Sequence, residues 1–526
     1  MSTATSTPAP ARHDQGWTAD LAERLALVPA WVWHALVALI ALAVRVVRLG
    51  TPGTLVFDET YYVKQAWSMT RSGVELRVDS SLEDSANAMF ASGTPGVFTG
   101  SGDLVVHPPL GKWLIAAGES ALGVEHPYSW RIATAIAGAL TVFVLARLVA
   151  TVLGAWWGAL AGALLAFETT SFAVSRTGIL DSFLALFATS ALLFVVLDRR
   201  WSTVALRRWS AGHGPGLYGP VLRHPWLWAA GASLGAMSAT KWSGAYLLAA
   251  LGVYVVGADA LARRRAGIVR WHVGALPGAV LAFVRLVGTA LVLYVASWAG
   301  WFASSLGYDR YWAVSNSAEG PARLVPSALR SLWHYHTEIY DLSAHLSTPH
   351  PYATHPAGWL LQDRPTLFYF ETLSPGTSGC AGPGDCYAGV TSLGTVPLWW
   401  LGVLAVLACV SMLVAGRARV GRTGLLAGIV VAGMVGEYLP WFTLGNRTIY
   451  SFYTAAFAPV VVLAVVTVLA ALAERGGRRE SFAQHAAVVL LALTLSWFVW
   501  FYPVLAAVPI SPDAWQARMG LWKRWS

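Results

Sequence analysis

Charged residues are scarce in this chain: they make up 12% of its 526 residues, against about 25% in a typical soluble domain. With 56% hydrophobic residues, this shortage excludes an ordinary soluble fold. Only three cysteines are present, which excludes a disulfide-rich secreted scaffold. Residues 1–17, MSTATSTPAPARHDQGW, lack the charged start and short apolar core of a cleavable signal peptide. The first apolar run is therefore expected to remain as a membrane span.

Long apolar runs recur along the chain instead. A helix needs about 20 mostly apolar residues to cross a hydrocarbon core roughly 30 Å thick, so the runs predict an all-α polytopic membrane protein with a membrane domain over 30–505. The Ser/Thr/Pro-rich segment 1–29 is expected to be a disordered tail. Eleven spans are expected, near residues 30–49, 130–150, 154–174, 179–197, 225–240, 243–261, 275–302, 396–415, 423–443, 451–473 and 484–505.

Arginine-rich connections set the expected orientation. They fall on alternate loops, at 198–210, 262–270, 416–422 and 474–479. The positive-inside rule places these loops in the cytoplasm, and the same rule accounts for the net charge of +9. We recognise no nucleic-acid-binding module. The N-terminus is then cytoplasmic in a plasma-membrane protein, and three segments are extracytoplasmic: the loops 51–129 and 303–395 and the tail 506–526.

The second outer loop holds two features that bear on metal binding. Cys380 and Cys386 lie in CAGPGDC, and a disulfide is favoured over a metal site because no histidine or third cysteine is nearby. The run WHYHTEIYDLSAHLSTPHPYATHP, residues 333–356, is rich in histidine. Its irregular spacing favours a folded aromatic loop over a set of metal ligands.

Four cations depart from the orientation rule, because they lie at the expected outer ends of spans. They are Arg131, Arg176, Lys241 and Arg447. Ionisable residues in or near the membrane are candidates for function, although each could instead extend to the lipid headgroups. Four cations on one rim favour a phosphate-binding site. Asp181, five residues after Arg176, is expected to pair with it.

Two adjacent carboxylates, Asp58 and Glu59, occur in LVFDETYYVKQAWS on the same outer side. Neighbouring side chains diverge by about 100° on a helix, so the two are expected to have different roles. A hydroxyl that attacks a sugar phosphate needs one base, and cations make the phosphate a good leaving group. No Asp-x-Asp pair of the kind that holds a metal–nucleotide diphosphate is present, which agrees with a lipid-phosphate donor.

The order of motifs resembles the protein O-mannosyltransferase family in its short, actinobacterial-type form. The similar segments are LVFDETYY, HPPLGKWLIA, SWRIATAIAG, SRTGILDSFLALF, ATKWSGAYLL and NRTIYSFYTAAFAP, and they cover most of residues 40–460. The resemblance implies a C-type glycosyltransferase fold. It also implies inverting transfer of mannose from polyprenyl-phosphate mannose to Ser or Thr hydroxyls of secreted proteins. The loop 303–395 is too short for the β-trefoil repeat domain of eukaryotic members.

The resemblance also implies roles for individual residues. Asp58 would be the base, and Glu59 its partner at the acceptor. Arg131 would lie near the donor, while Lys241 and Arg447 would face the lipid phosphate. His107 and Arg176 are further substrate-binding candidates. No resident cofactor is implied, and a divalent metal remains open. The chemistry, apart from the resemblance, requires that the acceptor, a secretory protein, reach the outer cleft unfolded, so the Sec translocon is an expected partner.

Two other classes of function are weighed against this one. A lipid-phosphate-sugar transferase acting on a lipid or glycan needs the same base, so the chemistry does not separate it from a protein transferase. A flippase or transporter would carry charges along a route to both membrane faces. The candidate residues gather on one side, which favours a transferase.

Overall fold

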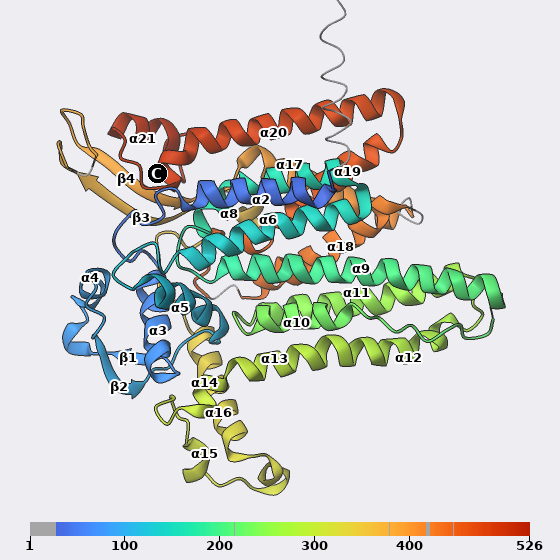
Figure 1. The fold of residues 1–526 in the computed structure, drawn as a ribbon, viewed down its shortest axis with the longest axis horizontal. Coiled ribbons are helices and arrows are strands. Elements are labelled where there is room, and N and C mark those ends of the chain that lie inside the picture. The colour runs from blue at the N-terminus through green and yellow to red at the C-terminus, as the bar shows by residue number, and fades with distance from the viewer. Residues whose placement is uncertain (1–27, 215, 378, 417–420, 445–446, 526) are drawn as a thin grey trace, which may run out of the picture.

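The computed structural model describes residues 28–525, except 215, 378, 417–420 and 445–446. The predicted disordered tail, 1–29, therefore lies almost wholly outside the described residues. Figure 1 shows a bundle of long helices lying side by side, with shorter helices and strands gathered at one end.

In the described part of the chain, seven helices are long and apolar enough to cross a membrane. Each coincides with an expected span, whereas the full count of eleven stays a prediction. They are α6 (Ile132–Leu153), α9 (Asp181–His213), α11 (Gly244–Arg265), α12 (Trp271–Phe283) continued by α13 (Thr289–Ser297), α17 (Val396–Val414), α18 (Arg422–Glu437) and α20 (Gly477–Leu505).

The remaining expected spans correspond to shorter helices, and two of them are interrupted. Glu168 breaks the predicted span 154–174, because its carboxylate accepts hydrogen bonds from the backbone N–H groups of Thr170 and Ser171 at 3.1 and 2.6 Å and so begins a new helix. The predicted span 451–473 starts with the 3₁₀ helix η7 (Ser451–Ala456). The shorter helices are α2 (Ala30–Val46), α7 (Ala155–Ala166), α8 (Thr169–Val174), α10 (Leu227–Ser238) and α19 (Ala458–Ala473).

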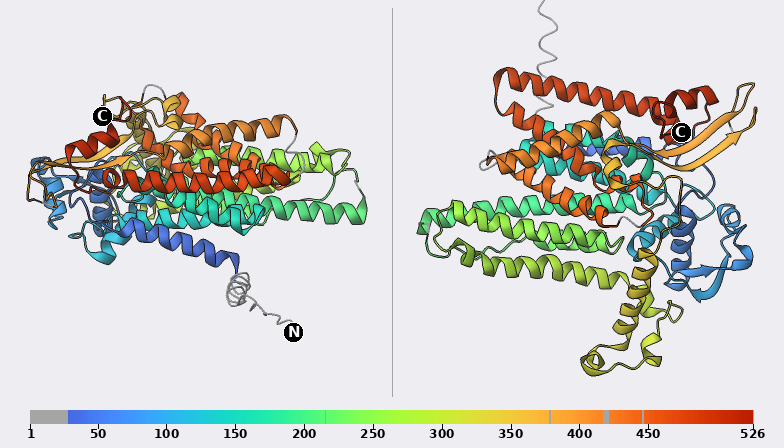
Figure 2. Two further views of the ribbon diagram at one scale, coloured as in Figure 1. Left: turned by 90° about the horizontal axis from the view of Figure 1, so that it is seen from above. Right: turned by 180° about the vertical axis from the view of Figure 1, so that it is seen from behind.

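The two long loops lie at the same end of the bundle (Figures 1 and 2). The C-terminal helix α21 (Pro512–Met519) lies there too. Three arginine-rich segments, 198–210, 262–270 and 474–479, lie toward the opposite end. This separation agrees with the alternation of charge along the sequence. Which end faces the cytoplasm remains an expectation.

The expectation of an all-α protein is wrong for the two long loops, which contain two small antiparallel sheets. One pairs β1 (Leu76–Val78) with β2 (Phe98–Gly102), and the other pairs β3 (Thr366–Leu373) with β4 (Cys386–Ser392). Aromatic and β-branched residues dominate β3 and favour a strand there, and Tyr387, Val390 and Thr391 supply the same preference in β4. The helices of these segments are α3 (Glu59–Ser72), α4 (Ala86–Ala91), α5 (Leu110–Leu122), α14 (Ala299–Ala303), α15 (Trp312–Ser315) and α16 (Ser327–Ala344).

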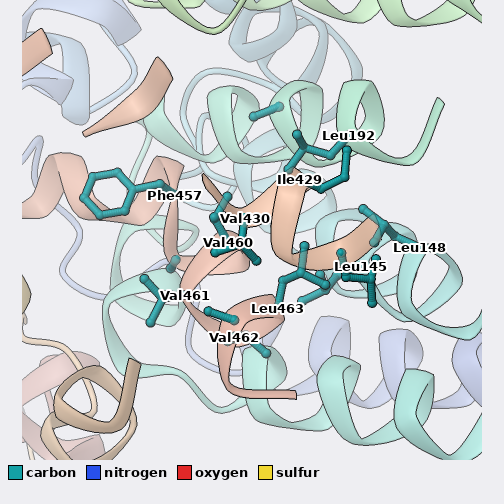
Figure 3. Packing of buried hydrophobic residues seen from close by; sticks show 14 of the residues in the cluster. Leu145, Leu148, Leu192, Ile429, Val430, Phe457, Val460, Val461, Val462 and Leu463 are labelled. Carbon is teal, nitrogen blue, oxygen red and sulfur yellow. The ribbon is translucent and has the colours of Figure 1, made fainter. Parts of the chain in front are cut away.

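The largest core lies between α6, α9, α18 and α19. Figure 3 shows Leu145 and Leu148 of α6 directed toward Leu463 of α19, and Leu192 of α9 beside Ile429 of α18. Small residues bring other helices together. A Cβ atom on Gly436 of α18 would lie 2.7 Å from a backbone atom of α11, so only glycine permits this approach. The contact fixes the C-terminal end of α18 against the start of α11.

Candidate active site

A cavity of about 460 Å³ lies at the end of the bundle where the two long loops gather. Its walls come from the start of α9, the segment from the end of α10 to the start of α11, the end of α16, the segment from the end of α18 to Arg447, η7 and the loop before α5. Its polar lining residues include three of the predicted site residues and two carboxylates. These five are His107, Lys241, Arg447, Asp181 and Glu437.

Asp58 lies beside this cavity, at the residue that precedes α3. Its Oδ2 atom accepts a hydrogen bond from the Tyr62 hydroxyl at 3.3 Å, and the Tyr62 ring lies 5.9 Å from the ring of cavity-lining His107. In the described part of the chain Asp58 forms no salt bridge. Burial raises the pKa of Asp58 to about 6, against the opposing effect of the Lys241 charge. This carboxyl group is therefore poised to exchange a proton near neutral pH.

Glu59 points elsewhere, as the divergence of adjacent side chains predicts. It is fully buried, and its carboxylate accepts hydrogen bonds from Arg131 at 2.7 and 2.8 Å, from Gly178 N–H at 2.7 Å and from Val56 N–H at 3.0 Å. No oxygen of Glu59 is left for an acceptor substrate. Its predicted place at the acceptor does not agree with this geometry, which instead fixes the turn that carries Asp58.

Arg131 is the counterpart of Glu59, and it has no free donor. Two of its five N–H groups reach Glu59, and the other three reach the carbonyl oxygens of Leu49, Pro52 and Thr54 at 3.2, 2.8 and 2.9 Å. Arg131 therefore has no N–H group left to bind the donor directly, and its predicted place near the donor stays a prediction. Its guanidinium ties the loop 49–54 to the start of α3 and orients Asp58 indirectly.

Arg176 also forms hydrogen bonds with the protein backbone and does not line the cavity. Its guanidinium donates to the carbonyl oxygens of Arg45, Val47 and Arg48, at the end of α2. The predicted pairing of Arg176 with Asp181 is wrong. Asp181 instead accepts from the Lys241 ammonium at 2.7 Å, because α9 begins beside the loop between α10 and α11.

Lys241 and Arg447 are the two predicted cations that line the cavity. The Lys241 ammonium lies 5.2 Å from the centre of the Tyr453 ring, which holds it against η7. The Arg447 Nε atom is buried and has no hydrogen-bond partner among the described residues. Arg447 is therefore a cavity-lining cation with a donor left for a ligand.

His107 lines the cavity between these groups. Burial, followed by the nearby charges of Lys241, Arg447 and Lys112, holds the pKa of His107 well below its usual value. The ring is therefore neutral at neutral pH. The His107 carbonyl oxygen accepts from Lys112 Nζ at 2.9 Å, which anchors the loop to α5.

The sequence did not identify two parts of the cavity wall. Glu437 is 5% exposed, and both of its carboxylate oxygens lack a partner in the described part of the chain. In the sequence, only the position of Glu437 near the end of a predicted span set it apart from other residues. The histidine-rich run contributes α16, whose Tyr340, Ser343 and Ala344 close one side of the cavity.

The two histidines of α16 contact protein groups: His334 Nε2 lies 3.1 Å from Asp309 Oδ2, and His336 packs among aromatic rings. The Tyr294 hydroxyl lies 2.6 Å from His336 Nε2 and accepts from cavity-lining Trp242 at 2.9 Å. In the residues that the structure describes, no cluster of three or more His, Cys, Asp and Glu residues is arranged to hold a metal ion. A disulfide joins Cys380 to Cys386 at the β3–β4 hairpin.

Two protein-family profiles match the chain. Residues 35–261 match "Dolichyl-phosphate-mannose-protein mannosyltransferase", and residues 328–525 match the "C-terminal four TMM region of protein-O-mannosyltransferase". Among curated relatives, the polyprenol-phosphate-mannose–protein mannosyltransferase of Mycobacterium tuberculosis is 32% identical, with 93% of this chain and 91% of the relative covered. The Corynebacterium glutamicum protein of that name is 30% identical, with coverage of 93% and 92%.

The fold has a counterpart among solved structures. The Pmt1–Pmt2 protein O-mannosyltransferase complex of Saccharomyces cerevisiae, bound to the sugar donor, aligns with a TM-score of 0.68 at 15% identity, covering 96% of this chain and 94% of that one. The bundle and its cavity thus define a polytopic membrane protein with the C-type glycosyltransferase fold. The similarity to the mycobacterial relatives makes the assignment particular: the chain belongs to the protein O-mannosyltransferase family.

Proposed function

We propose that this chain transfers mannose from polyprenyl-phosphate mannose to Ser or Thr hydroxyls of exported proteins. The family supports the reaction class, since the curated relatives carry this activity in their names. One observation supports the mechanism most directly. Asp58 is a half-buried carboxylate with no ion pair among the described residues, and it lies beside a cavity that contains Lys241 and Arg447. The reaction is assigned to the extracytoplasmic face of the plasma membrane, with the N-terminus in the cytoplasm.

The transfer is a single displacement with inversion. The acceptor oxygen forms a bond to the anomeric carbon while the bond from that carbon to the phosphate oxygen breaks. The electron pair of the broken bond leaves with the phosphate, and the acceptor proton passes to Asp58. Because the pKa of Asp58 is raised to about 6, the group is largely ionised at neutral pH and basic enough to accept the proton.

Lys241 and Arg447 are assigned to the phosphate. The Asp181 carboxylate lies 2.7 Å from the Lys241 ammonium. This ion pair fixes the position of the ammonium group and partly neutralises its positive charge. The unpaired Arg447 Nε donates to a phosphate oxygen as negative charge develops on the leaving group. Neutral His107 lies between these cations and Tyr62, where it contributes a hydrogen bond without adding a third positive charge.

Glu59, Arg131 and Arg176 are assigned to positioning. Their hydrogen bonds hold the segment 45–59 in the shape that presents Asp58 to the cavity. The acceptor reaches Asp58 as an extended chain, because a hydroxyl inside a folded domain is not accessible to a recessed base. Delivery by the Sec translocon fits this requirement.

A peptide transfer assay tests the proposal. Membranes containing the chain are incubated with polyprenyl-phosphate [¹⁴C]mannose and a Thr/Pro-rich peptide, and label is separated into peptide, glycan and lipid fractions. Label in the peptide, bound to Thr and resistant to removal by lipid extraction, is the expected result. Label only in lipid or glycan would assign the chain to transfer onto those acceptors and would contradict the proposal.

A further inference from the structure

The Glu437 carboxylate is an unpaired buried acid in the wall of the donor cavity. The residue is 5% exposed, and neither oxygen has a hydrogen-bond partner among the described residues. A charged group buried without a partner is costly, so such a group in a binding cavity indicates a partner that arrives with the ligand. Nothing in the catalytic scheme above uses Glu437.

The neighbouring cations do not neutralise Glu437. Lys241 is paired with Asp181, and no described lysine, arginine or histidine lies within salt-bridge distance of the Glu437 carboxylate. Gly436 packs closely on Leu247 of α11, which fixes the backbone that carries the acid. The carboxylate is therefore held in place and not balanced from within the protein.

The donor lipid consists of a polyprenyl chain, a phosphate and a sugar, and only the sugar can donate hydrogen bonds to a carboxylate. The polyprenyl chain offers no hydrogen-bond donor, and the phosphate is itself negative. The sugar hydroxyls are donors that bind an ionised or a neutral carboxyl group. This inference rests on the proposed function, since it takes a sugar phosphate lipid as the occupant of the cavity.

An aromatic surface accompanies the acid. Trp441 lies one helical turn beyond Glu437, lines the cavity, and donates its Nε1–H to the Glu437 carbonyl oxygen at 2.9 Å. Its ring is 4.8 Å from the ring of Tyr453, which also lines the cavity. Such rings offer an apolar face to the C–H surface of a sugar. We propose that Glu437 and Trp441 form the sugar subsite, in which the Glu437 carboxyl group accepts hydrogen bonds from hydroxyls of the transferred mannose.

Two ligands separate the sugar from the rest of the lipid. The purified full-length protein in lipid nanodiscs is titrated with polyprenyl-phosphate mannose and, separately, with polyprenyl phosphate that carries no sugar. For Glu437→Leu we expect the Kd of the mannosyl lipid to rise by at least about tenfold, the combined effect of losing the hydrogen bonds from the sugar hydroxyls and leaving those hydroxyls unpaired. The Kd of the sugar-free lipid should change by less than about twofold. Glu437→Gln, which keeps the size and one acceptor, should lie between wild type and Glu437→Leu.

A matched control is available in Glu119 of α5. It is 1% exposed, and both of its carboxylate oxygens lack a partner among the described residues, like those of Glu437, but it does not line the cavity. Glu119→Gln should leave the ratio of the two Kd values unchanged. If Glu437→Leu fails to fold, the ratio of the two Kd values for Glu437→Gln tests the sugar subsite in its place.

Three results would overturn the assignment: equal loss of affinity for both lipids, no change for either, or unchanged lipid affinities with a raised KM for the peptide. The last would place Glu437 at the acceptor. Failure of the wild type to transfer mannose in the peptide assay would contradict the proposed function instead. The two failures are therefore distinguishable.

Discussion

Replacement of Arg131 by alanine separates a structural role from direct contact with the donor. Arg131 and Glu59 have side-chain exposures of 1% and 0%, so Arg131→Ala leaves a buried carboxylate without its cation. Breaking such a pair from one side costs about 3–5 kcal/mol. Three backbone carbonyl oxygens also lose their donors. We expect a large drop in thermal stability, together with loss of transfer, because the turn before Asp58 is released.

A mutant cycle tests the same reasoning quantitatively. Glu59→Gln alone leaves Arg131 with a weakened partner and should also destabilise the protein. The double variant Glu59→Gln/Arg131→Gln removes both charges, so its loss of stability should be smaller than the sum of the two single losses. Thermal unfolding in detergent measures all three variants against wild type. An Arg131→Ala protein with wild-type unfolding temperature and reduced affinity for polyprenyl phosphate would refute this reasoning and restore a direct contact with the phosphate.

Three further outcomes follow from the geometry of the cavity. Arg447→Ala should weaken binding of sugar-free polyprenyl phosphate by about tenfold or more while the unfolding temperature stays unchanged, because its Nε has no hydrogen-bond partner among the described residues. A loss of stability without a loss of lipid affinity would contradict this. The initial transfer rate should rise with pH through about 6 and level off above it, since Asp58 accepts a proton only when ionised. Tyr62→Phe removes a hydrogen bond that lowers the pKa of Asp58, so the rise should move to higher pH, and a shift to lower pH would count against this assignment.

Local patterns in the sequence predicted the parts of the structure that depend on local physics. Apolar length located the seven long membrane helices, and the helical angle between neighbours predicted that Asp58 and Glu59 point in different directions. The sequence also contained the information needed to predict the helix break at Glu168. The run Glu168-Thr169-Thr170-Ser171 places an acid that can cap a helix inside an apolar segment. Such a cap is missed when hydropathy is averaged over all the residues of a predicted span, because one acid hardly changes the mean.

Pairings between distant residues could not be predicted in this way. Arg131 lies 72 positions from Glu59, and Lys241 lies 60 positions from Asp181. Charge and position relative to the membrane made all four outer cations equivalent in the sequence. The structure distinguishes them by where their donors go: Arg131 and Arg176 donate to buried protein groups, whereas Lys241 and Arg447 face the cavity.

Comparison of Asp58→Asn with wild type tests the central claim, that Asp58 is the base beside a cationic donor site. The substitution keeps the size of the side chain and removes its ability to take up a proton. Transfer of mannose to the peptide should fall to background, while the Kd of polyprenyl-phosphate mannose should stay within about threefold of wild type. Transfer at a near wild-type rate, or loss of donor binding in parallel with transfer, would contradict the account.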